Sequence, residues 1–408
     1  MRRLLASRLL LLSLAHFTID AYASFLSPLL PLIVTKLHLT LTQVGTLVAL
    51  SSLSSSLSQP LFGWLADRLR RPWFVAFGPL LAAVFLSAVG VASNFGMLAA
   101  LVMLGGLGGA SFHPQGASLA TALAERRALA LSLFVTGGTL GFALGPLFAV
   151  SVVGTWGLDR TWVAAAPGLV VSTLVLAWFA RLAPRAARDG ARPALAELRP
   201  LARPLTLLYF AVVCRSAVSY GFMTFLPILL HRRGFTIAAG GAVLTGYLGL
   251  GALGGLAGGW LADRWGGRRV VIASFLGSAP LYFGFLALPG TLGLVSLVLG
   301  SLVLQASLPV NVAMGQELAP RHSSTISSLL MGAAWGLGAL LVGPTGALAD
   351  AHGLTVALGG LASLLAVGFG CALSLPEVRH AIPPVELGRP AVVVEGDDAE
   401  PNRLEPAR

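Results

Sequence analysis

The stretch Gly-Trp-Leu-Ala-Asp-Arg occupies residues 63–68 and returns, in the same order, at residues 259–264. Each copy lies where a long apolar run ends in a basic turn. Six identical residues at an offset of 196 positions, in a chain of 408 residues, indicate two halves built on one plan. The repeat therefore sets the expected organisation of the whole chain.

The composition of the chain is that of a membrane protein. Hydrophobic residues make up 56% of it and charged residues only 11%, with a mean hydropathy of +0.84. Soluble domains carry about 25% charged residues. Because a helix needs roughly 20 apolar residues to cross a bilayer, about a dozen spans fit between Leu9 and Leu375. Two membrane-embedded halves are the layout that secondary transporters have.

We predict an all-α integral membrane fold with twelve transmembrane helices in two six-helix, pseudo-symmetric halves. The spans are expected at 9–34, 42–65, 73–93, 97–121, 128–152 and 162–182, and then at 204–230, 237–262, 270–289, 292–317, 323–348 and 353–375. The domains are residues 1–182, a basic cytoplasmic linker at 183–203, residues 204–375, and a tail at 376–408. The tail is too polar to pack, so we expect it to be disordered and cytoplasmic.

The net charge of +11 is a sign of membrane topology. Arginines cluster in the short connectors after every second span, as the positive-inside rule requires of cytoplasmic loops. An even number of spans then places both termini in the cytoplasm, in a multi-pass protein of the cell (inner or plasma) membrane. With the basic residues used in this way, no nucleic-acid partner is expected. The N-terminus imitates a signal peptide, but its apolar run continues to Val34, so we interpret it as the first span.

Several other chemistries have no support in the sequence. Cys214 and Cys371 lie inside apolar runs, and the seven histidines have no metal-ligand spacing, so neither a disulfide framework nor a metal site is predicted. The single lysine, Lys36, has no Gly-rich loop around it, which excludes a Walker-type phosphate loop. No nucleophile elbow or attached catalytic domain favours an enzyme, and no cofactor is expected. An ion gradient is then the simplest energy source, and a sensor on a transporter-like bundle is the rival interpretation.

Proline recurs inside every third span and predicts a cavity. Spans one, four, seven and ten carry interior prolines and most of the polar side chains. Proline frees a backbone carbonyl that lipid cannot satisfy, so such helices face protein or water. We therefore expect these four spans to line a central cavity. Their polar residues include His16, Asp20, His113, Gln115, Arg215, Tyr220, Gln305 and Asn311.

Small residues recur in spans two, five, eight and eleven. Glycines four residues apart lie on one helix face and let backbones approach closely. We expect these spans to form the sliding contact between the halves. The rows are the serines from Ser51 to Ser56; Gly137, Gly141 and Gly145 with Pro146; Gly251, Gly255 and Gly259; and Gly332 with Gly336.

Asp20 is the first candidate for a proton site. A carboxylate at membrane depth costs on the order of 3 kcal/mol unless it faces a cavity or a partner. Burial also disfavours its charged form, which permits reversible protonation near neutral pH. His16 lies four residues earlier on the same helix face and can pair with Asp20 or relay a proton. The alternative is a structural hydrogen bond that tethers span one.

Arg215 is the candidate for binding an acidic substrate. It lies near the middle of span seven, and a buried guanidinium stays charged and makes a forked clamp for anions. The alternative is a standing ion pair with Asp20 across the cavity. His113, Gln115, Tyr220 and Asn311 are the further candidates for substrate contact, although His113 is equally compatible with ordinary packing.

The repeated stretch resembles the loop motif that follows the second and eighth spans of the major facilitator superfamily. The second copy continues with Gly266 and Arg268-Arg269, whereas the first has Arg70-Arg71-Pro72 where glycine would stand. The resemblance implies the major facilitator fold, alternating access between two sides of the membrane, and a monomer.

The resemblance also implies that these loops gate the cavity. Asp67 is expected to meet the start of span eleven near Ser323, and Asp263 the start of span five near Ala128. A carboxylate at a helix N-terminus contributes up to about 2 kcal/mol when partly buried. The alternative is a solvated turn that only sets topology. The gating candidates are Asp67, Arg68, Asp263 and Arg264.

The first half more closely resembles the fosmidomycin-resistance proteins, which are proton-driven drug-efflux carriers. The resemblance covers about residues 11–350. It rests on His16, Asp20, Pro28, Pro31, Gln59-Pro60, Gly63, Asp67, Phe112-His113-Pro114, Gly137-Gly138, Leu144-Gly145-Pro146 and, in the second half, Gln316 to Pro320. Ile19, Gln115 and Ser118 depart from the Asn, Glu and Arg of those proteins, as if a buried charge pair had been replaced as a unit. The row from Gly137 to Pro146 resembles an antiporter motif of span five.

The expected function is efflux of a small polar or anionic, drug-like molecule in exchange for protons. The partners are that small-molecule substrate, protons and the lipid bilayer. The alternative is proton-coupled uptake of a small organic solute, because the same fold and protonation chemistry run in either direction.

Overall fold

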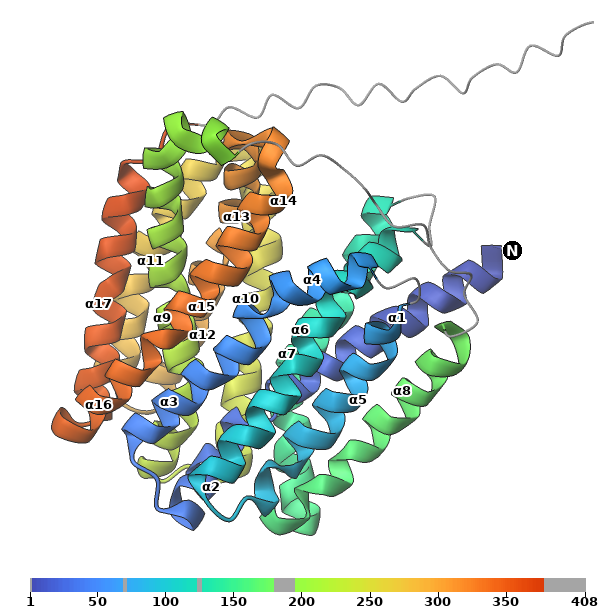
Figure 1. Ribbon diagram of the computed structural model, residues 1–408. Coiled ribbons are helices and arrows are strands. Elements are labelled where there is room, and N and C mark those ends of the chain that lie inside the picture. The colour runs from blue at the N-terminus through green and yellow to red at the C-terminus, as the bar shows by residue number, and fades with distance from the viewer. Residues whose placement is uncertain (1, 69–71, 123–126, 180–194, 378–408) are drawn as a thin grey trace, which may run out of the picture. The chain divides into compact units, whose positions relative to one another are not determined.

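The computed structural model describes residues 2–68, 72–122, 127–179 and 195–377, and each element in these ranges is a helix (Figure 1). Up to residue 179 the elements are α1 (Arg2–Ala23), η1 (Ser27–Leu29), α2 (Leu30–Leu37), α3 (Leu41–Ser52), η2 (Leu53–Leu57), α4 (Gln59–Arg68), α5 (Trp73–Ser87), η3 (Ala88–Val91), α6 (Phe95–Ala122), α7 (Arg127–Trp156), η4 (Leu158–Ala164) and α8 (Ala165–Phe179). From residue 195 they are η5 (Leu195–Leu201), α9 (Ala202–Arg232), α10 (Ile237–Trp265), α11 (Gly267–Ala287), α12 (Gly290–Gln305), α13 (Ser307–Leu318), η6 (Pro320–His322), α14 (Ser323–Ser327), η7 (Ser328–Ala333), α15 (Ala334–Leu340), α16 (Val342–His352) and α17 (Leu354–Leu373).

Eleven helical segments of the described chain are long and apolar enough to cross a bilayer. The segment Leu41–Arg68 corresponds to the remaining predicted span, at 42–65, and it is interrupted by the π-helical turn η2 and a turn at Ser58. Its serines explain the interruption. Ser54 Oγ donates to the Ser51 carbonyl at 2.9 Å, and the Gln59 side chain donates to the Ser55 carbonyl at 3.0 Å. Such bonds to the preceding turn compete with the helix and bend it.

Two ends of the bundle must be distinguished. The inner end is where α4 and α10 end, beside the basic connectors, and the outer end is the opposite one, where α3 and α10 begin. Residues 2–179 and 195–377 meet mainly through α3 with α16 and through α7 with α10. Figure 1 shows α3 and α16 side by side.

One contact between the two parts of the chain carries a trace of the repeat. Ser27 Oγ donates to the Met223 carbonyl at 2.7 Å, and the two residues are 196 positions apart. That separation equals the offset of the repeated stretch, so these are equivalent positions. In a two-fold arrangement, equivalent positions touch only beside the axis. The contact supports the predicted halves; their boundaries at 182, 203 and 375 stay a prediction.

Spans two, five, eight and eleven form the contact between the two parts of the chain, as predicted. The glycine rows of spans five and eight, however, do not make that contact. A Cβ on Gly137 or Gly141 would meet the backbone of α1 at Ser13 or Phe17, within the same half. On α10 the tight row is Gly254 and Gly258, against the backbone of α12 and α13, while Gly259 has open space. Close backbone approach is thus present, but it joins neighbours inside each half. The row of span eleven does face the other half, since a Cβ on Gly336 would meet Leu57.

Two predicted segments are largely outside the described residues. They are residues 180–194 of the linker region and residues 378–408 of the tail. The linker residues that are described form the short helix η5, and the His322 ring contacts Glu197 of that helix at 3.3 Å.

Candidate functional site

A cavity of about 2730 Å³ runs into the bundle from the inner end. The predicted spans one, four, seven and ten line it, and spans two, five, eight and eleven line it as well, which the sequence analysis had assigned only to packing. The lining reaches Trp64 and Ala66 on α4, and Arg321 and His322 opposite. Of the described residues, those at the outer ends of α3 and α16 do not line it.

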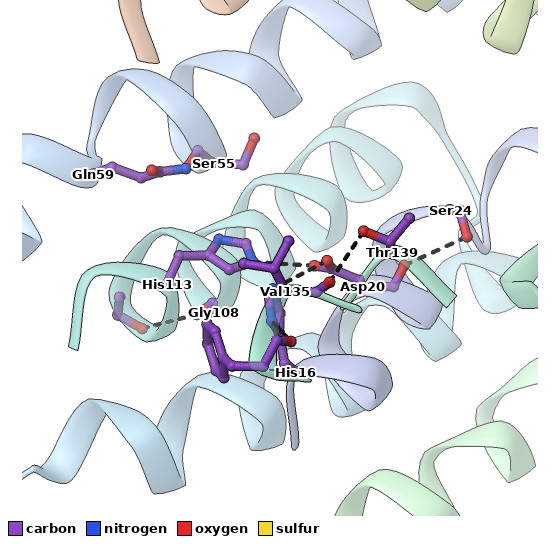
Figure 2. A network of polar contacts seen from close by, with 11 residues as sticks. His16, Asp20, Ser24, Ser55, Gln59, Gly108, His113, Val135 and Thr139 are labelled. Carbon is purple, nitrogen blue, oxygen red and sulfur yellow. Dashed lines mark hydrogen bonds and ion pairs between the residues drawn. The ribbon is translucent and has the colours of Figure 1, made fainter. Parts of the chain in front are cut away.

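Asp20 lies at the centre of a three-residue cluster on the cavity wall. Its Oδ2 is 3.3 Å from His16 Nε2, and its Oδ1 is 3.0 Å from His113 Nε2. His16 comes from the preceding turn of α1, as the four-residue spacing predicted, and His113 comes from α6 (Figure 2). His16 is 8% exposed, and all three residues line the cavity.

The hydrogen bonds determine which atoms of this cluster carry a hydrogen. His16 Nδ1 lies 2.8 Å from the Phe134 carbonyl, which can only accept, so Nδ1 carries a hydrogen. A neutral His16 then presents a bare Nε2 to the carboxylate of Asp20. Two acceptors repel, so their contact requires a proton, carried either by the imidazole or by the carboxyl group. His113 can donate to the other oxygen in its neutral form.

Packing holds the His16 ring in this orientation. The ring stacks on Phe134 with centroids 4.1 Å apart, and it meets the His113 ring edge-on at 5.1 Å. Gly138 lies against the pair, because a Cβ there would stand 2.6 Å from Asp20 Oδ2. Gly138 was named only in the resemblance to the fosmidomycin-resistance proteins, with no role in the site. The sequence feature that could have indicated its role is the doublet Gly137-Gly138, because Gly138 does not belong to the row of glycines spaced four residues apart.

Arg215 faces the same cavity from α9. Its guanidinium donates to Gln305 Oε1 at 2.7 Å and to Ser216 Oγ at 3.0 Å, and it lies 5.6 Å from the centre of the Trp335 ring. The residue is 3% exposed, and its Nε has no partner among the described residues. Among the described residues no carboxylate forms an ion pair with Arg215, so the alternative of a standing ion pair with Asp20 is not present in this conformation.

Asp20 and Arg215 lie at corresponding places in the two parts of the chain. Their separation is 215 − 20 = 195 positions, one less than the repeat offset of 196. A carboxylate with two imidazoles on one wall and a buried cation on the other therefore flank one aqueous space. Gln305 was predicted only as a polar residue of the cavity lining, and Trp335 was not predicted at all, because neither spacing nor composition relates them to Arg215.

Of the remaining predicted substrate contacts, two line the cavity and one does not. Tyr220 lines the cavity. Gln115 lines it too, but its Oε1 accepts the backbone N–H of Val75 at 3.1 Å, which gives it a structural task. Asn311 is 0% exposed and is not part of the cavity wall, and its side-chain nitrogen and oxygen have no partner in the described chain.

The predicted gating residues are only partly described. The side chains of Asp67, Arg68, Ser323 and Ala128 lie outside the described ones. Asp263 is exposed at the inner end of α10, and the Arg264 guanidinium lies 3.7 Å from the centre of the Trp260 ring. The gating contacts therefore stay a prediction.

The cluster around Asp20 also contains the ligand types of a metal site. One ligand atom each from His16, Asp20 and His113 lies within 4.8 Å of the others. The linear spacing of the histidines gave no sign of this, because His113 reaches Asp20 from a helix 93 positions further along the chain. Both carboxylate oxygens already face imidazole nitrogens, so the three side chains satisfy one another without an ion.

Comparison with known proteins identifies the family. The profile of the Major Facilitator Superfamily matches residues 12–343. The chain belongs to the Major Facilitator Superfamily. It is 31% identical over 372 residues to the uncharacterized MFS-type transporter YfnC of Bacillus subtilis (strain 168), covering 88% of this chain and 90% of the relative. It is 29% identical over 383 residues to the fosmidomycin resistance protein of Escherichia coli (strain K12), covering 90% and 92%.

Solved structures share the fold of this superfamily member. A bacterial homolog of the human lysosomal transporter Spinster, in an inward-facing and occupied conformation, matches with a TM-score of 0.76 over 90% of this chain and 96% of that one, at 18% identity. The nucleoside transporter NupG matches with a TM-score of 0.70 over 91% and 98%, at 15% identity. The predicted fold class is confirmed. The protein is a multi-pass membrane transporter of small molecules and not an enzyme.

Proposed function

We propose that this transporter exports a small polar or anionic molecule in exchange for protons, by alternating access of one central site. The observation that carries the proposal is that the Asp20 cluster and the buried Arg215, from different parts of the chain, line the same cavity. Asp20 with His16 is the proposed proton site, and Arg215 is the proposed anchor for the substrate, with His113 and Tyr220 beside it.

The hydrogen-bond inventory supports proton binding at the Asp20 cluster. The contact of His16 Nε2 with Asp20 requires one shared proton, and the cavity gives that proton access to water. Loss of the proton leaves two acceptors facing each other, and gain of a second proton leaves a positive cluster. Protonation therefore changes the charge that a substrate meets on this wall.

The isolation of Arg215 supports an anionic or strongly polar substrate. Burying a charge without a counter-charge is unfavourable, and the neutral partners Gln305 and Ser216 satisfy only part of the guanidinium. An anion in the cavity would compensate the charge. The affinity of the cavity for that anion would depend on the protonation of the Asp20 cluster, which links the two fluxes.

Relatives favour export over import. The chain is 28% identical over 304 residues to the multidrug resistance protein MdtG of Enterobacter lignolyticus (strain SCF1), and the fosmidomycin resistance protein is also a resistance protein by name. Basic connectors at the inner end support a cytoplasmic position for that end and for both termini, so the cavity would load from the cytoplasm. We propose that the functional unit is a monomer, with one complete cavity per chain.

A proton gradient supplies enough energy for this exchange. One proton gains about 2.3 kcal/mol per 100 mV and about 1.4 kcal/mol per pH unit. At about 150 mV and half a pH unit the total is roughly 4 kcal/mol, or near a thousandfold solute gradient per proton.

Asp20→Asn tests the proton site. A sensitivity screen of deletion and overexpression strains, with fosmidomycin among the compounds, first identifies a transported probe. Everted vesicles then measure uptake of that probe driven by an imposed pH gradient, which should fall to background in Asp20→Asn because the amide cannot take up the proton. Asp159→Asn, an exposed carboxylate that pairs with Lys36 at the outer end, is the matched control and should retain transport.

The same vesicles give the results that contradict the proposal. A normal rate of pH-driven accumulation in correctly inserted Asp20→Asn would remove Asp20 as the coupling residue. Accumulation in right-side-out vesicles, with none in everted ones, would favour the alternative of uptake. Arg215→Gln that binds an anionic probe as tightly as the wild type would remove the anion anchor.

A further inference from the structure

The outer end of the bundle holds a third copy of the core of the repeated stretch. Residues 346–350 read Gly-Ala-Leu-Ala-Asp, and they share Gly-x-Leu-Ala-Asp with residues 63–67 and 259–263. The first two copies end at the inner end, whereas this one ends α16 at the outer end. Its aspartate, Asp350, is therefore placed to act on the opposite side of the membrane from Asp67 and Asp263.

Asp350 caps a helix of the other half. Its Oδ1 accepts the backbone N–H of Leu41 at 2.9 Å, and its Oδ2 accepts the backbone N–H of Thr42 at 2.8 Å and the Thr42 hydroxyl at 2.6 Å. Thr40 accepts the next N–H, that of Gln43, at 3.1 Å. The first three N–H groups of α3 thus each have an oxygen partner, and two of these depend on a carboxylate about 310 positions away in the chain.

The capping contact lies where the two helices touch by their backbones. A Cβ on Gly346 would meet the Leu41 backbone, and one on Gly45 would stand 2.8 Å from the Cα of Gly343. With glycine on both sides there is no side chain between α3 and α16 at this end. The cavity opens toward the inner end of the same two spans, where Ser55 of η2, Gln59 of α4 and Thr325 of α14 line it.

We propose that Asp350 is a latch that holds the outer end closed, and that its release from α3 is a step in opening the cavity to the outer side. A carboxylate at a helix N-terminus is attracted by both the free N–H groups and the helix dipole. The Asp350 contacts join two parts of the chain that separate during alternating access. Their free energy therefore stabilises the outer-closed conformation relative to the outer-open one. A cap within one half would stabilise both conformations equally.

The latch predicts a population shift that distance measurements detect. Cys214 and Cys371 are first replaced by serine. Spin labels are attached through Ser93→Cys, before α6, and Thr291→Cys, in the first turn of α12, two exposed positions at the outer end. Asp350→Ala should increase the long-distance, outer-open population about tenfold relative to the inner-open one, since it removes hydrogen bonds to a charged group. Asp350→Asn, which keeps the shape but not the charge, should produce a smaller shift in the same direction.

Two further variants keep the test decisive. Thr42→Val removes only the hydroxyl contact and should shift the populations in the same direction by a smaller factor, even if Asp350→Ala inserts poorly. Asp159→Ala breaks the outer ion pair with Lys36 inside one half and should leave the distances unchanged. Unchanged distances in folded Asp350→Ala and Thr42→Val, or an equal shift in Asp159→Ala, would overturn the latch. The measurement needs neither substrate nor a pH gradient, so its outcome is independent of the proposed transport function.

Discussion

At the scale of single residues, the proposed proton coupling depends on where one proton resides in the Asp20 cluster. The Phe134 carbonyl fixes the hydrogen on His16 Nδ1, so the face of the ring that meets Asp20 is the face that can gain or lose a proton. His113 holds the other carboxylate oxygen and shares the aqueous cavity. Both imidazoles contact the same carboxylate, so removing either one should alter the contact that the other makes.

Gly138→Ala tests the packing of this cluster without changing any of its ionisable groups. A Cβ there would stand 2.6 Å from Asp20 Oδ2, so the carboxylate must move away from His16. We expect pH-driven transport to fall about a hundredfold, the order of loss that misplacing a reacting group by an ångström causes. The measurement is the initial rate in vesicles with equal amounts of protein. Gly154→Ala on the same helix, with nothing within 4 Å of its added carbon, should transport normally; equal rates for both variants would refute the prediction.

The sequence predicted the pairing of two of the three residues of this cluster. His16 and Asp20 were paired because four residues in a helix bring side chains together. The contacts of His113, Phe134 and Gly138 depend on how α6 and α7 pack on α1, which spacing along the chain does not encode. For the same reason Arg215 was recognised as a buried cation, whereas its actual partner, Gln305, was not, and Asn311 was assigned to the cavity although it lies outside it.

At the scale of helices, glycine determines which backbones approach one another, and the periodicity of a row does not identify the tight face. On α10 the sequence row was Gly251, Gly255 and Gly259, but the close backbone contacts use Gly254, against Leu302 of α12, and Gly258, against Ala306 between α12 and α13. Both rows have a spacing of four, so both satisfy the pattern. Only the position of the neighbouring helix distinguishes them, and that position is a property of the fold.

Gly258→Ala and Gly246→Ala should differ in stability although both lie in α10. A Cβ on Gly258 would stand 2.6 Å from the Cα of Ala306, a backbone atom that cannot yield, whereas nothing lies within 4 Å of a Cβ on Gly246. Overpacking of this kind costs about 1–3 kcal/mol, so Gly258→Ala should lower the midpoint of thermal unfolding in detergent by several degrees. Gly246→Ala should leave it near the wild type. A lower midpoint in Gly246→Ala alone would show that the helix pair is wrongly assigned.

At the scale of the whole molecule, hydropathy predicted the number of spans and the repeat predicted their relation, but neither predicted a conformation. The cavity is reached from the inner end, while α3 and α16 touch at the outer end. The same sequence folds into every conformation of an alternating-access cycle, so sequence patterns do not indicate which conformation a structure will show. The Gly-x-Leu-Ala-Asp segments are the features that relate the sequence to a conformation, because two of them lie at the inner end of the bundle and the third at the outer end.

Opposite latches should shift the resting conformation in opposite directions. Ser132, which lines the cavity and is exposed, is replaced by cysteine in a chain without Cys214 and Cys371, and its alkylation in everted vesicles reports opening of the inner end. Asp67→Ala should raise the labelling rate, because the inner closure loses a contact of up to about 2 kcal/mol. Asp350→Ala should lower the rate, because the outer closure is weakened. The double variant should return close to the original rate, since distant sites add. A rate unaffected by Asp67→Ala would leave that residue as a determinant of topology alone.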